Sequence, residues 1–276
     1  MKLVTSNRAN KILYNFIKSN NIKGKVLLPA NICTSVVHTL CYAGLDLLFV
    51  DIQTDLCMDQ AAALRLAPEA SLLLFVHTYG VEQEYHTFFQ QLRSANPNLA
   101  IVDDKCLCLP DLQVEDSPAD LVLYSTETKM LVDLGGGAIG YIADRWAYDE
   151  VEVEPNDYLT NEQWLLDTKQ LYIKMDAMIA HKERLNTIYR TMLPASVQLL
   201  DIYQHWRFNI MTDQQQAILD ALFAEGLFAS SHYASQSAEC PLANNLHAYV
   251  INLFNDQYYT KEQAIRTCEI INSIIQ

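Results

Sequence analysis

Residues 72–104 read LLLFVHTYGVEQEYHTFFQQLRSANPNLAIVDD, and this stretch predicts the fold class. Its two ends, residues 72–76 and 99–102, are short apolar runs of the kind that form buried strands. Between them, residues 82–94 carry apolar side chains at helical spacing. Two buried strands joined by a helix indicate neighbouring parallel strands, because such strands need a long crossover connection.

The same alternation runs through the first 145 residues. Residues 33–43 form a predicted helix that ends at Gly44, since glycine readily adopts the left-handed conformation that follows many helices. A first predicted helix begins at Ala9, with Thr5 or Ser6 as its N-cap. The remaining predicted elements are a helix over residues 58–66 and strands over residues 25–28, 47–50, 121–125 and 138–142. We therefore predict an α/β fold with a mostly parallel sheet sandwiched by helices, and ligands at the carboxyl ends of its strands.

The second half of the chain predicts a smaller α+β unit. An acidic stretch, residues 149–157, is typical of a solvated connector. A long helix is predicted over residues 162–192. After it we expect strands over residues 206–210 and 247–253 and helices over residues 213–223 and 261–275. We predict a large domain over residues 1–178 and a small C-terminal domain over residues 179–276.

Composition excludes several classes of protein. Of 276 residues 50% are hydrophobic, and 19 basic residues against 33 acidic ones give a net charge of −14, which disfavours binding to a nucleic acid polymer. The seven cysteines are scattered without a C-x-x-C pair, which favours reduced thiols and a cytoplasmic location. The first residues turn polar too early for a signal peptide, and no apolar run reaches the roughly 18 residues of a membrane span.

Three familiar motif types do not account for the chain. Residues 135–140 read GGGAIG, which matches the dinucleotide-binding pattern but leads into a strand instead of a helix. These glycines are better explained by a backbone that passes close to a ligand or a neighbouring chain. We predict no metal site, because the seven histidines are dispersed and residues 106–108 lack partners at zinc spacing. The G-x-S-x-G elbow of many hydrolases is absent.

Lys129 and Asp104 each follow a predicted strand at the ligand-binding edge of the sheet. Most lysines in such a place are ordinary surface residues, and that interpretation stays open for Lys129. Together, a lysine and a carboxylate can hold pyridoxal phosphate (PLP), since the lysine forms a Schiff base and the carboxylate keeps the pyridine nitrogen protonated. Amides at the start of the first helix, near residues 6–8, are suited to its phosphate.

Six segments in order along the chain resemble the DegT/DnrJ/StrS-type sugar aminotransferases, which are fold-type-I PLP enzymes. They are TSNRA (5–9), LPANICTS (28–35), GLDLLFVD (44–51), VHTYG (76–80), IVDD (101–104) and YSTETKMLVDLGGG (124–137). The match continues through residues 231–233 and 250–253.

This resemblance implies a role for each matching residue. Lys129 would form the Schiff base, and Asp104 would hold the pyridine nitrogen. The phosphate would be bound by Ser125 and by the helix opening at Ser6, Asn7 and Arg8. Cys33 would lie beneath the cofactor ring. His77 would lie against the cofactor or substrate, or would be a hydrogen-bonded histidine at a strand end.

The resemblance also implies an activity, which is amino transfer from an amino acid to a nucleotide-linked keto sugar. It further implies a role in surface-polysaccharide or related biosynthesis, and a homodimer. The chain departs from the family pattern at Asn7, which replaces a glycine, and at Cys33, where many relatives have an aromatic residue. It also has Lys105-Cys106-Leu107 after Asp104, a shorter interval from Ser125 to Lys129 and a shorter second half. Two alternatives therefore stay open: a non-catalytic homologue that acts as a binding or partner subunit, and another PLP chemistry such as a lyase or dehydratase.

Overall fold

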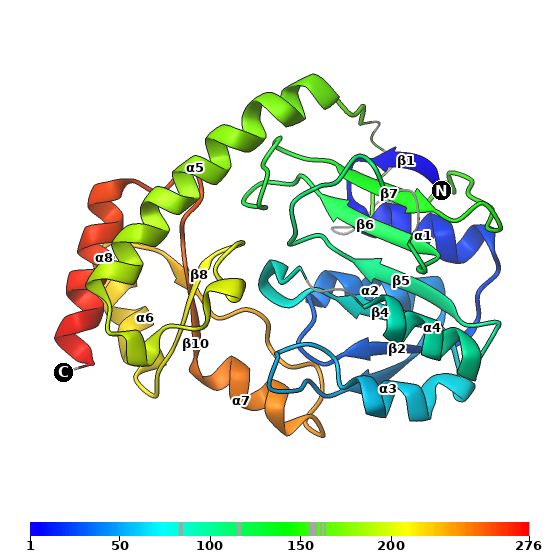
Figure 1. The fold of residues 1–276 in the computed structure, drawn as a ribbon, viewed down its shortest axis with the longest axis horizontal. Coiled ribbons are helices and arrows are strands. Elements are labelled where there is room, and N and C mark those ends of the chain that lie inside the picture. The colour runs from blue at the N-terminus through cyan, green and yellow to red at the C-terminus, as the bar shows by residue number, and fades with distance from the viewer. Residues whose placement is uncertain (83–84, 115–116, 155–158, 161, 163, 276) are drawn as a thin grey trace.

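The computed structural model describes residues 1–82, 85–114, 117–154, 159–160, 162 and 164–275. Figure 1 shows two lobes joined by the helix α5 (Thr168–Met192). The large lobe precedes α5 and holds a large sheet with its helices. The small lobe follows α5 and ends at the C-terminus. None of the described helices has the length and apolar character needed to cross a membrane.

The large lobe is built on a seven-stranded sheet with the order β1-β7-β6-β5-β4-β2-β3. The five neighbouring strands β6, β5, β4, β2 and β3 pair in parallel. The pairs β6–β7 and β1–β7 are antiparallel. The strands are β1 (Lys2–Ser6), β2 (Gly24–Pro29), β3 (Leu45–Val50), β4 (Ala70–Val76), β5 (Ala100–Asp104), β6 (Leu121–Ser125) and β7 (Ala138–Ile142). The predicted α/β fold with a mostly parallel sheet is confirmed.

The edge strand β1 was not predicted. Only Val4 of its five residues is buried, so residues 2–6 carry no apolar pattern that indicates a strand. Because Thr5 and Ser6 belong to β1, the first helix begins later, at α1 (Ala9–Ser19), and its N-cap residue is Arg8. The predicted capping by Thr5 or Ser6 is therefore wrong.

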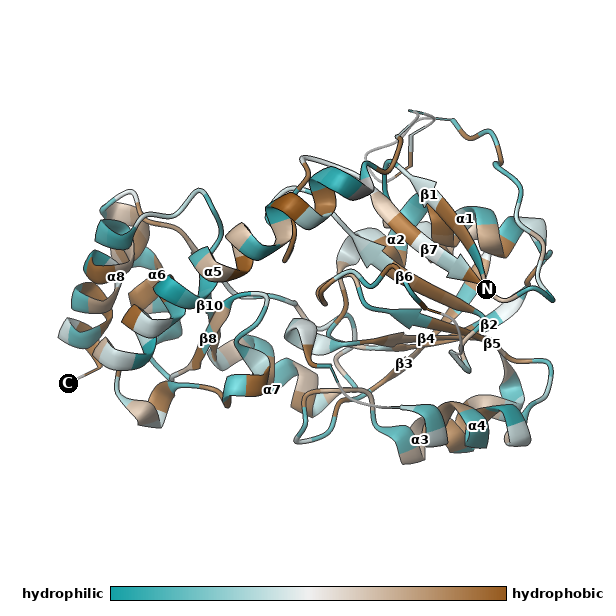
Figure 2. Ribbon diagram, turned by 45° about the horizontal axis from the view of Figure 1, so that its top comes forward, coloured by the Kyte–Doolittle hydropathy of each residue, from teal (hydrophilic) through white to brown (hydrophobic). Residues whose placement is uncertain are grey.

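The central strands bury both of their faces. Figure 2 shows the hydrophobic residues of the sheet in brown. In β4, Leu72 and Leu74 pack on the face covered by α1 and α2 (Thr34–Ala43), while Leu73 and Phe75 pack on the opposite face. That opposite face is covered by α3 (Gln60–Leu66), α4 (His86–Ala95) and the first half of α5. Gly44 follows α2 in the left-handed conformation, with φ of 91°, as predicted.

The small lobe contains a three-stranded antiparallel sheet with the order β8-β10-β9. Its elements are β8 (Phe208–Met211), α6 (Gln215–Ala224), β9 (Ala229–Ser230), α7 (Pro241–Tyr249), β10 (Val250–Leu253) and α8 (Lys261–Ile274). Short 3-10 helices are η1 (Ala67–Glu69), η2 (Thr78–Gly80), η3 (Ala195–Val197) and η4 (Asp201–Tyr203).

The helix α7 corrects the predicted strand over residues 247–253. Pro241 stands in the first turn of α7, where proline is well tolerated, and the Asp51 carboxylate accepts hydrogen bonds from the amides of Leu242 and Ala243. The helix continues to Tyr249, so the strand begins only at Val250. Because Asp51 follows β3 of the large lobe, this cap also ties the two lobes together.

The helix α5 contributes to the cores of both lobes. Leu171 and Met178 pack against the large sheet, whereas Leu185 and Tyr189 pack in the core of the small lobe. The helix starts at Thr168, where the Asp167 carboxylate caps it, which is later than the predicted start at residue 162. Residues 149–154 of the predicted connector have no regular structure, and residues 155–157 lie outside the described part of the chain. The division between residues 178 and 179 falls inside α5 and stays a prediction.

Between the lobes, α5 buries the amine of Lys182. Its Nζ donates hydrogen bonds to the carbonyl of Trp206 (2.9 Å) and to Oδ1 of Asn255 (3.0 Å). Burial lowers the pKa of Lys182 to about 7, while the charge of Asp256 acts in the opposite direction.

We predict that Lys182 gives the protein a pH-dependent stability. Between pH 7 and about 10.5 the unfolded state binds the Lys182 proton and the folded state does not, so the free energy of unfolding rises with pH by up to about 1.4 kcal/mol per unit. Lys182→Met should remove this slope. Urea denaturation of the wild type, K182M and the exposed control K174M at pH 7, 8 and 9 checks it. Parallel pH profiles for the wild type and K182M would contradict the prediction.

Candidate active site

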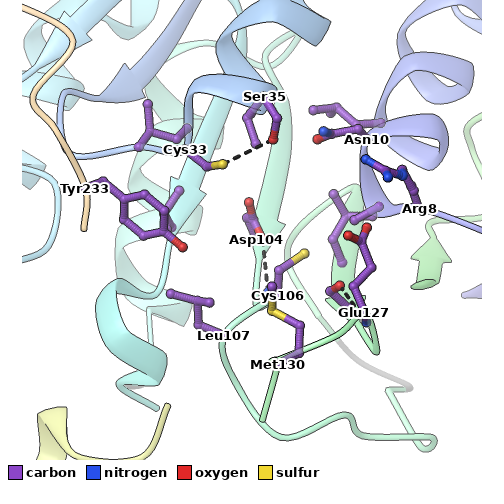
Figure 3. A pocket seen from close by; sticks show the side chains of 17 residues that line it. Arg8, Asn10, Cys33, Ser35, Asp104, Cys106, Leu107, Glu127, Met130 and Tyr233 are labelled. Atoms are coloured by element: carbon purple, nitrogen blue, oxygen red, sulfur yellow. Dashed lines mark hydrogen bonds between the residues drawn. The ribbon is translucent and has the colours of Figure 1, made fainter. Parts of the chain in front are cut away.

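A cavity of about 160 Å³ opens at the carboxyl ends of β4, β5 and β6, beneath the N-termini of α1 and α2. A volume of about 150 Å³ is enough for benzene, so one six-membered ring fits here. Figure 3 shows Asp104 in the middle, with Cys33 and Tyr233 on one side and Arg8 and Glu127 on the other. The lining residues are Arg8, Ala9, Asn10, Leu13, Ile32, Cys33, Ser35, Val36, Val76, Asp104, Cys106, Leu107, Leu123, Ser125, Glu127, Met130 and Tyr233.

Asp104, the last residue of β5, presents a buried carboxyl group to this cavity. Burial raises its pKa, whereas hydrogen bonds from Cys106 and the nearby His77 act in the opposite direction. One of these hydrogen bonds runs from the Cys106 amide to Oδ1 over 3.0 Å. A cation that enters the cavity would therefore find a buried acidic partner.

Asp103 lies on the opposite face of the sheet, because successive strand residues alternate. Its Oδ1 lies 2.7 Å from Nε2 of His77, and Nδ1 of His77 lies 2.7 Å from the carbonyl of Val81. His77 is buried and does not line the cavity. The structure thus places His77 in the hydrogen-bonded strand-end arrangement, one of the two alternatives left open by the sequence.

The positive end of α1 faces the cavity through Arg8, Ala9 and Asn10. The first amides of a helix have no partner within the helix, so an anion can bind there. Ser125, at the end of β6, contributes a hydroxyl on the same side. These groups form a binding site suited to a phosphate.

The other two residues predicted to bind the phosphate point elsewhere. The Ser6 hydroxyl donates to Oδ1 of Asn7, and Nδ2 of Asn7 donates to the hydroxyl of Thr160. Ser6 lines a separate cavity with Thr5 and Lys11. The structure brings Arg8 and Ser125 together at the main cavity but not Ser6 and Asn7, because Ser6 is held in β1.

Lys129 lies on a loop beside the cavity, but its exposed side chain does not line it. Its backbone is left-handed, with φ of 69°, and its amide donates to Oδ2 of Asp133 over 2.9 Å. Its Nζ lies 5.4 Å from the centroid of the Phe254 ring in the small lobe. The neighbouring Met130 forms the wall of the cavity at this point.

Cys33, the N-cap residue of α2, lines the cavity, and its place beneath a cofactor ring stays a prediction. Its Sγ lies 3.1 Å from the hydroxyl oxygen of Ser35. Cys33, Arg8, Asp104 and Ser125 are thus the predicted site residues that the fold gathers in one place.

Two lining residues were not assigned a role from the sequence. Glu127 lies on the Arg8 side of the cavity, where burial raises the pKa of its carboxyl group and Arg8 lowers it. Tyr233 comes from the small lobe, and its ring stacks on Trp206 at 6.2 Å and 9°. Glu127 carried a signal, since it lies between the predicted Ser125 and Lys129. Tyr233 lies in a segment of the family resemblance, but its place in the cavity depends on how the lobes meet.

At the triple glycine the structure shows one close approach, at Gly137, and the approach to a ligand or a neighbouring chain stays a prediction. A Cβ on Gly137 would lie 2.1 Å from the Trp164 ring, so the close approach is to a residue of the same chain. A Cβ on Gly135 or Gly136 would meet nothing within 4 Å. Among the described residues, no group of three or more His, Cys, Asp or Glu side chains is arranged for a metal ion.

Comparison with solved structures identifies the fold. Spr1654 of Streptococcus pneumoniae, assigned as a sugar aminotransferase and solved in its PLP form, superposes with a TM-score of 0.81 over 100% of this chain and 88% of that one, at 15% identity. PseC of Helicobacter pylori, an aminotransferase of pseudoaminic acid biosynthesis, gives 0.77 over 99% and 87%, at 15% identity. A DegT/DnrJ/EryC1/StrS aminotransferase of Brucella abortus gives 0.76 over 99% and 86%, at 14% identity.

No protein-family profile and no curated protein sequence matches the chain. At these identities the likeness shows the fold, and at that level the resemblance seen in the sequence is confirmed.

Proposed function

We propose that this chain is a PLP-dependent aminotransferase that transfers an amino group from an amino acid to a nucleotide-linked keto sugar. The observation that carries the proposal is the cavity in which the buried Asp104 carboxyl faces the positive end of α1. The sugar substrate is supported by the structural neighbours, among them PseC and DesI, which was solved with its TDP-sugar product. We place the reaction in surface-polysaccharide or related biosynthesis in the cytoplasm.

The residues present fit the cofactor. Asp104 would hold the pyridine nitrogen, because a protonated ring supplies the counter-charge for this buried carboxylate. Arg8, the first amides of α1 and Ser125 would hold the phosphate. When bound, PLP supplies the electron sink that amino transfer needs. Glu127 lies near Arg8, so a bound phosphate would replace its carboxylate as the partner of Arg8.

Lys129 is the residue we propose for covalent attachment of the cofactor and for proton transfer at its Nζ. Support comes from the position of its loop, since Met130 lines the cavity. The loop is held by Asp133, whose carboxylate accepts hydrogen bonds from the amides of Lys129 and Gly135. For this role the Lys129 side chain must turn from Phe254 into the cavity.

A second candidate is a non-catalytic homologue that binds a ligand or partner. Two observations favour it: Nζ of Lys129 lies over Phe254, and Glu127 lies where a phosphate would bind. The visible absorption spectrum with added PLP distinguishes the two, because only covalently bound PLP gives a lasting absorption band after dialysis.

We predict that borohydride treatment of the protein with PLP labels Lys129. Peptide mass mapping of the wild type should find the pyridoxyl group on this residue, and K129M should lose it. K105M is the matched control, since Lys105 is another lysine near the strand ends and should not affect the labelling. Labelling of a different lysine, or none at saturating PLP, would disprove the assignment.

Asp104 and Asp103 should differ sharply when each is replaced by asparagine. D104N should lower the rate of reaction with an amino donor by about 10²-fold or more, because a neutral amide does not keep the ring protonated. It should still permit covalent labelling. D103N should have the milder effect on this rate, since Asp103 faces His77. Stopped-flow absorbance of the cofactor gives both rates, and the reverse order would contradict the assignment.

We further propose a homodimer. The N-terminal part of α5 and the segment before it expose three large apolar side chains, Leu165, Tyr172 and Ile173. Exposed apolar patches mark interaction surfaces, and twofold pairing is the commonest way to cover them. Light scattering at micromolar concentration should give twice the 31.4 kDa chain mass. Tyr172→Lys with Ile173→Lys should shift it to the monomer, and a monomeric wild type would contradict the proposal.

A further inference from the structure

Arg207 is a buried cation without a carboxylate partner. The residue is 4% exposed, and no described Asp or Glu lies within ion-pair distance of its guanidinium group. Among the described residues its one hydrogen bond runs from Nη1 to the hydroxyl of Ser230 at 3.5 Å, and Nε has none. The guanidinium stacks on Phe254, with Cζ 3.5 Å from the ring centroid. Such stacking offsets only part of the free energy needed to bury a charge.

Asp256 does not form an ion pair with Arg207. Asp256 favours the charged form of Arg207 at a distance, but its Oδ1 accepts a hydrogen bond from the Tyr258 amide. Burial lowers the pKa of Arg207 to about 10, so it remains a cation at neutral pH. The neighbouring His232 is neutral there, because burial and Arg207 lower its pKa to about 4. Arg207 therefore has spare capacity to bind an anion.

Arg207 and Lys129 share an aromatic neighbour, Phe254. Nζ of Lys129 is 5.4 Å from the centroid of the same Phe254 ring, so the two charged groups are at most 8.9 Å apart, the sum of the two ring distances. Phe254 is half-buried and Lys129 is exposed, which brings this pair close to solvent. Arg207 also stacks at 4.8 Å on Trp206, whose ring packs on Tyr233 in the cavity wall.

We propose that Arg207 binds the carboxylate of the amino-acid donor next to Lys129. The proposal rests on the proposed function, in which the amine of the donor must reach Lys129. An α-amino acid carries its amine and its carboxylate on one carbon, so binding sites for the two must lie close together. The planar guanidinium suits a carboxylate, and its unpartnered Nε supplies a donor for it.

The test uses two measurements on the wild type, R207M, R207K and R266M. Arg266 is an exposed arginine on α8 that pairs with Glu225 and Glu269, and serves as the matched control. The first measurement is the melting temperature of the cofactor-free protein with glutarate, neutral glutaramide or inorganic phosphate. The second is the apparent Kd for L-glutamate, read from the cofactor absorbance of the PLP-loaded protein.

We expect glutarate, but not glutaramide, to raise the melting temperature of the wild type and of R266M. R207M should lose this response and weaken L-glutamate binding about tenfold or more, while PLP labelling of Lys129 stays unchanged. Without ligand R207M should be at least as stable as the wild type, because it removes an unpaired buried charge. If R207M does not fold, R207K decides, since it keeps the charge and loses the planar donor set.

Three results would overturn the proposal. The first is a response of R207M to glutarate that equals the response of the wild type. If R207M does not fold, the same result in R207K counts instead. The second is equal stabilisation of the wild type by glutaramide, or no response to glutarate. The third is a response to phosphate alone, which would assign Arg207 to a phosphate of the sugar nucleotide. A wild type that responds to glutarate through Arg207 but binds no PLP refutes the proposed function and leaves an anion site at Arg207.

Discussion

The end of β5 buries two consecutive carboxyl groups on opposite faces of one sheet, and the site depends on this constraint. A buried carboxylate needs hydrogen bonds or a counter-charge. On one face Asp103 meets His77, whose other nitrogen is held by the Val81 carbonyl. On the other face Asp104 has the Cys106 amide and an open cavity. The first carboxyl group is thus satisfied within the protein, and the second is left for a ligand.

Much of the large lobe could be predicted because its strands are buried on both faces and form continuous apolar runs. Prediction from apolar runs fails where a strand buries only one face, or where an element depends on a contact with a residue far along the chain. β1 buries only Val4, and α7 owes its start partly to Asp51, some 190 residues earlier. The carboxyl ends of the strands locate Asp104 and Ser125, since the order of parallel strands brings them together. Such patterns do not encode the side-chain direction of Lys129 on its loop, and β1 carries no pattern that would place Ser6 in a strand. The direction of these two side chains away from the cavity therefore could not be predicted.

Aromatic stacking connects the site with the small lobe. Tyr79, after β4, stacks on Trp206 at 6.3 Å and 10°, and Trp206 stacks on Tyr233 in the cavity wall. The Trp206 indole N–H also donates to the Lys129 carbonyl over 3.3 Å, while its own carbonyl accepts from Lys182. One residue of the small lobe therefore contacts the cavity wall, the Lys129 loop and the helix that joins the lobes. A change in the angle between the lobes must alter these contacts together.

The distribution of charge fits a site for anions between the lobes. The chain carries 14 more acidic than basic residues, yet Lys129, Lys182 and Arg207 gather here. Burial lowers the pKa of Lys182, and its amine donates hydrogen bonds to neutral acceptors.

Arg207 does not lose its proton at neutral pH, so its charge persists in a place where water is scarce. Keeping such a charge lowers the stability of the free protein, and a bound anion removes this penalty. Asp104 is a second buried ionisable group without an ion-pair partner among the described residues, and it faces the cavity. A cation in the cavity at Asp104 and an anion at Arg207 would match both groups, as the cofactor and the amino-acid donor proposed above would do together.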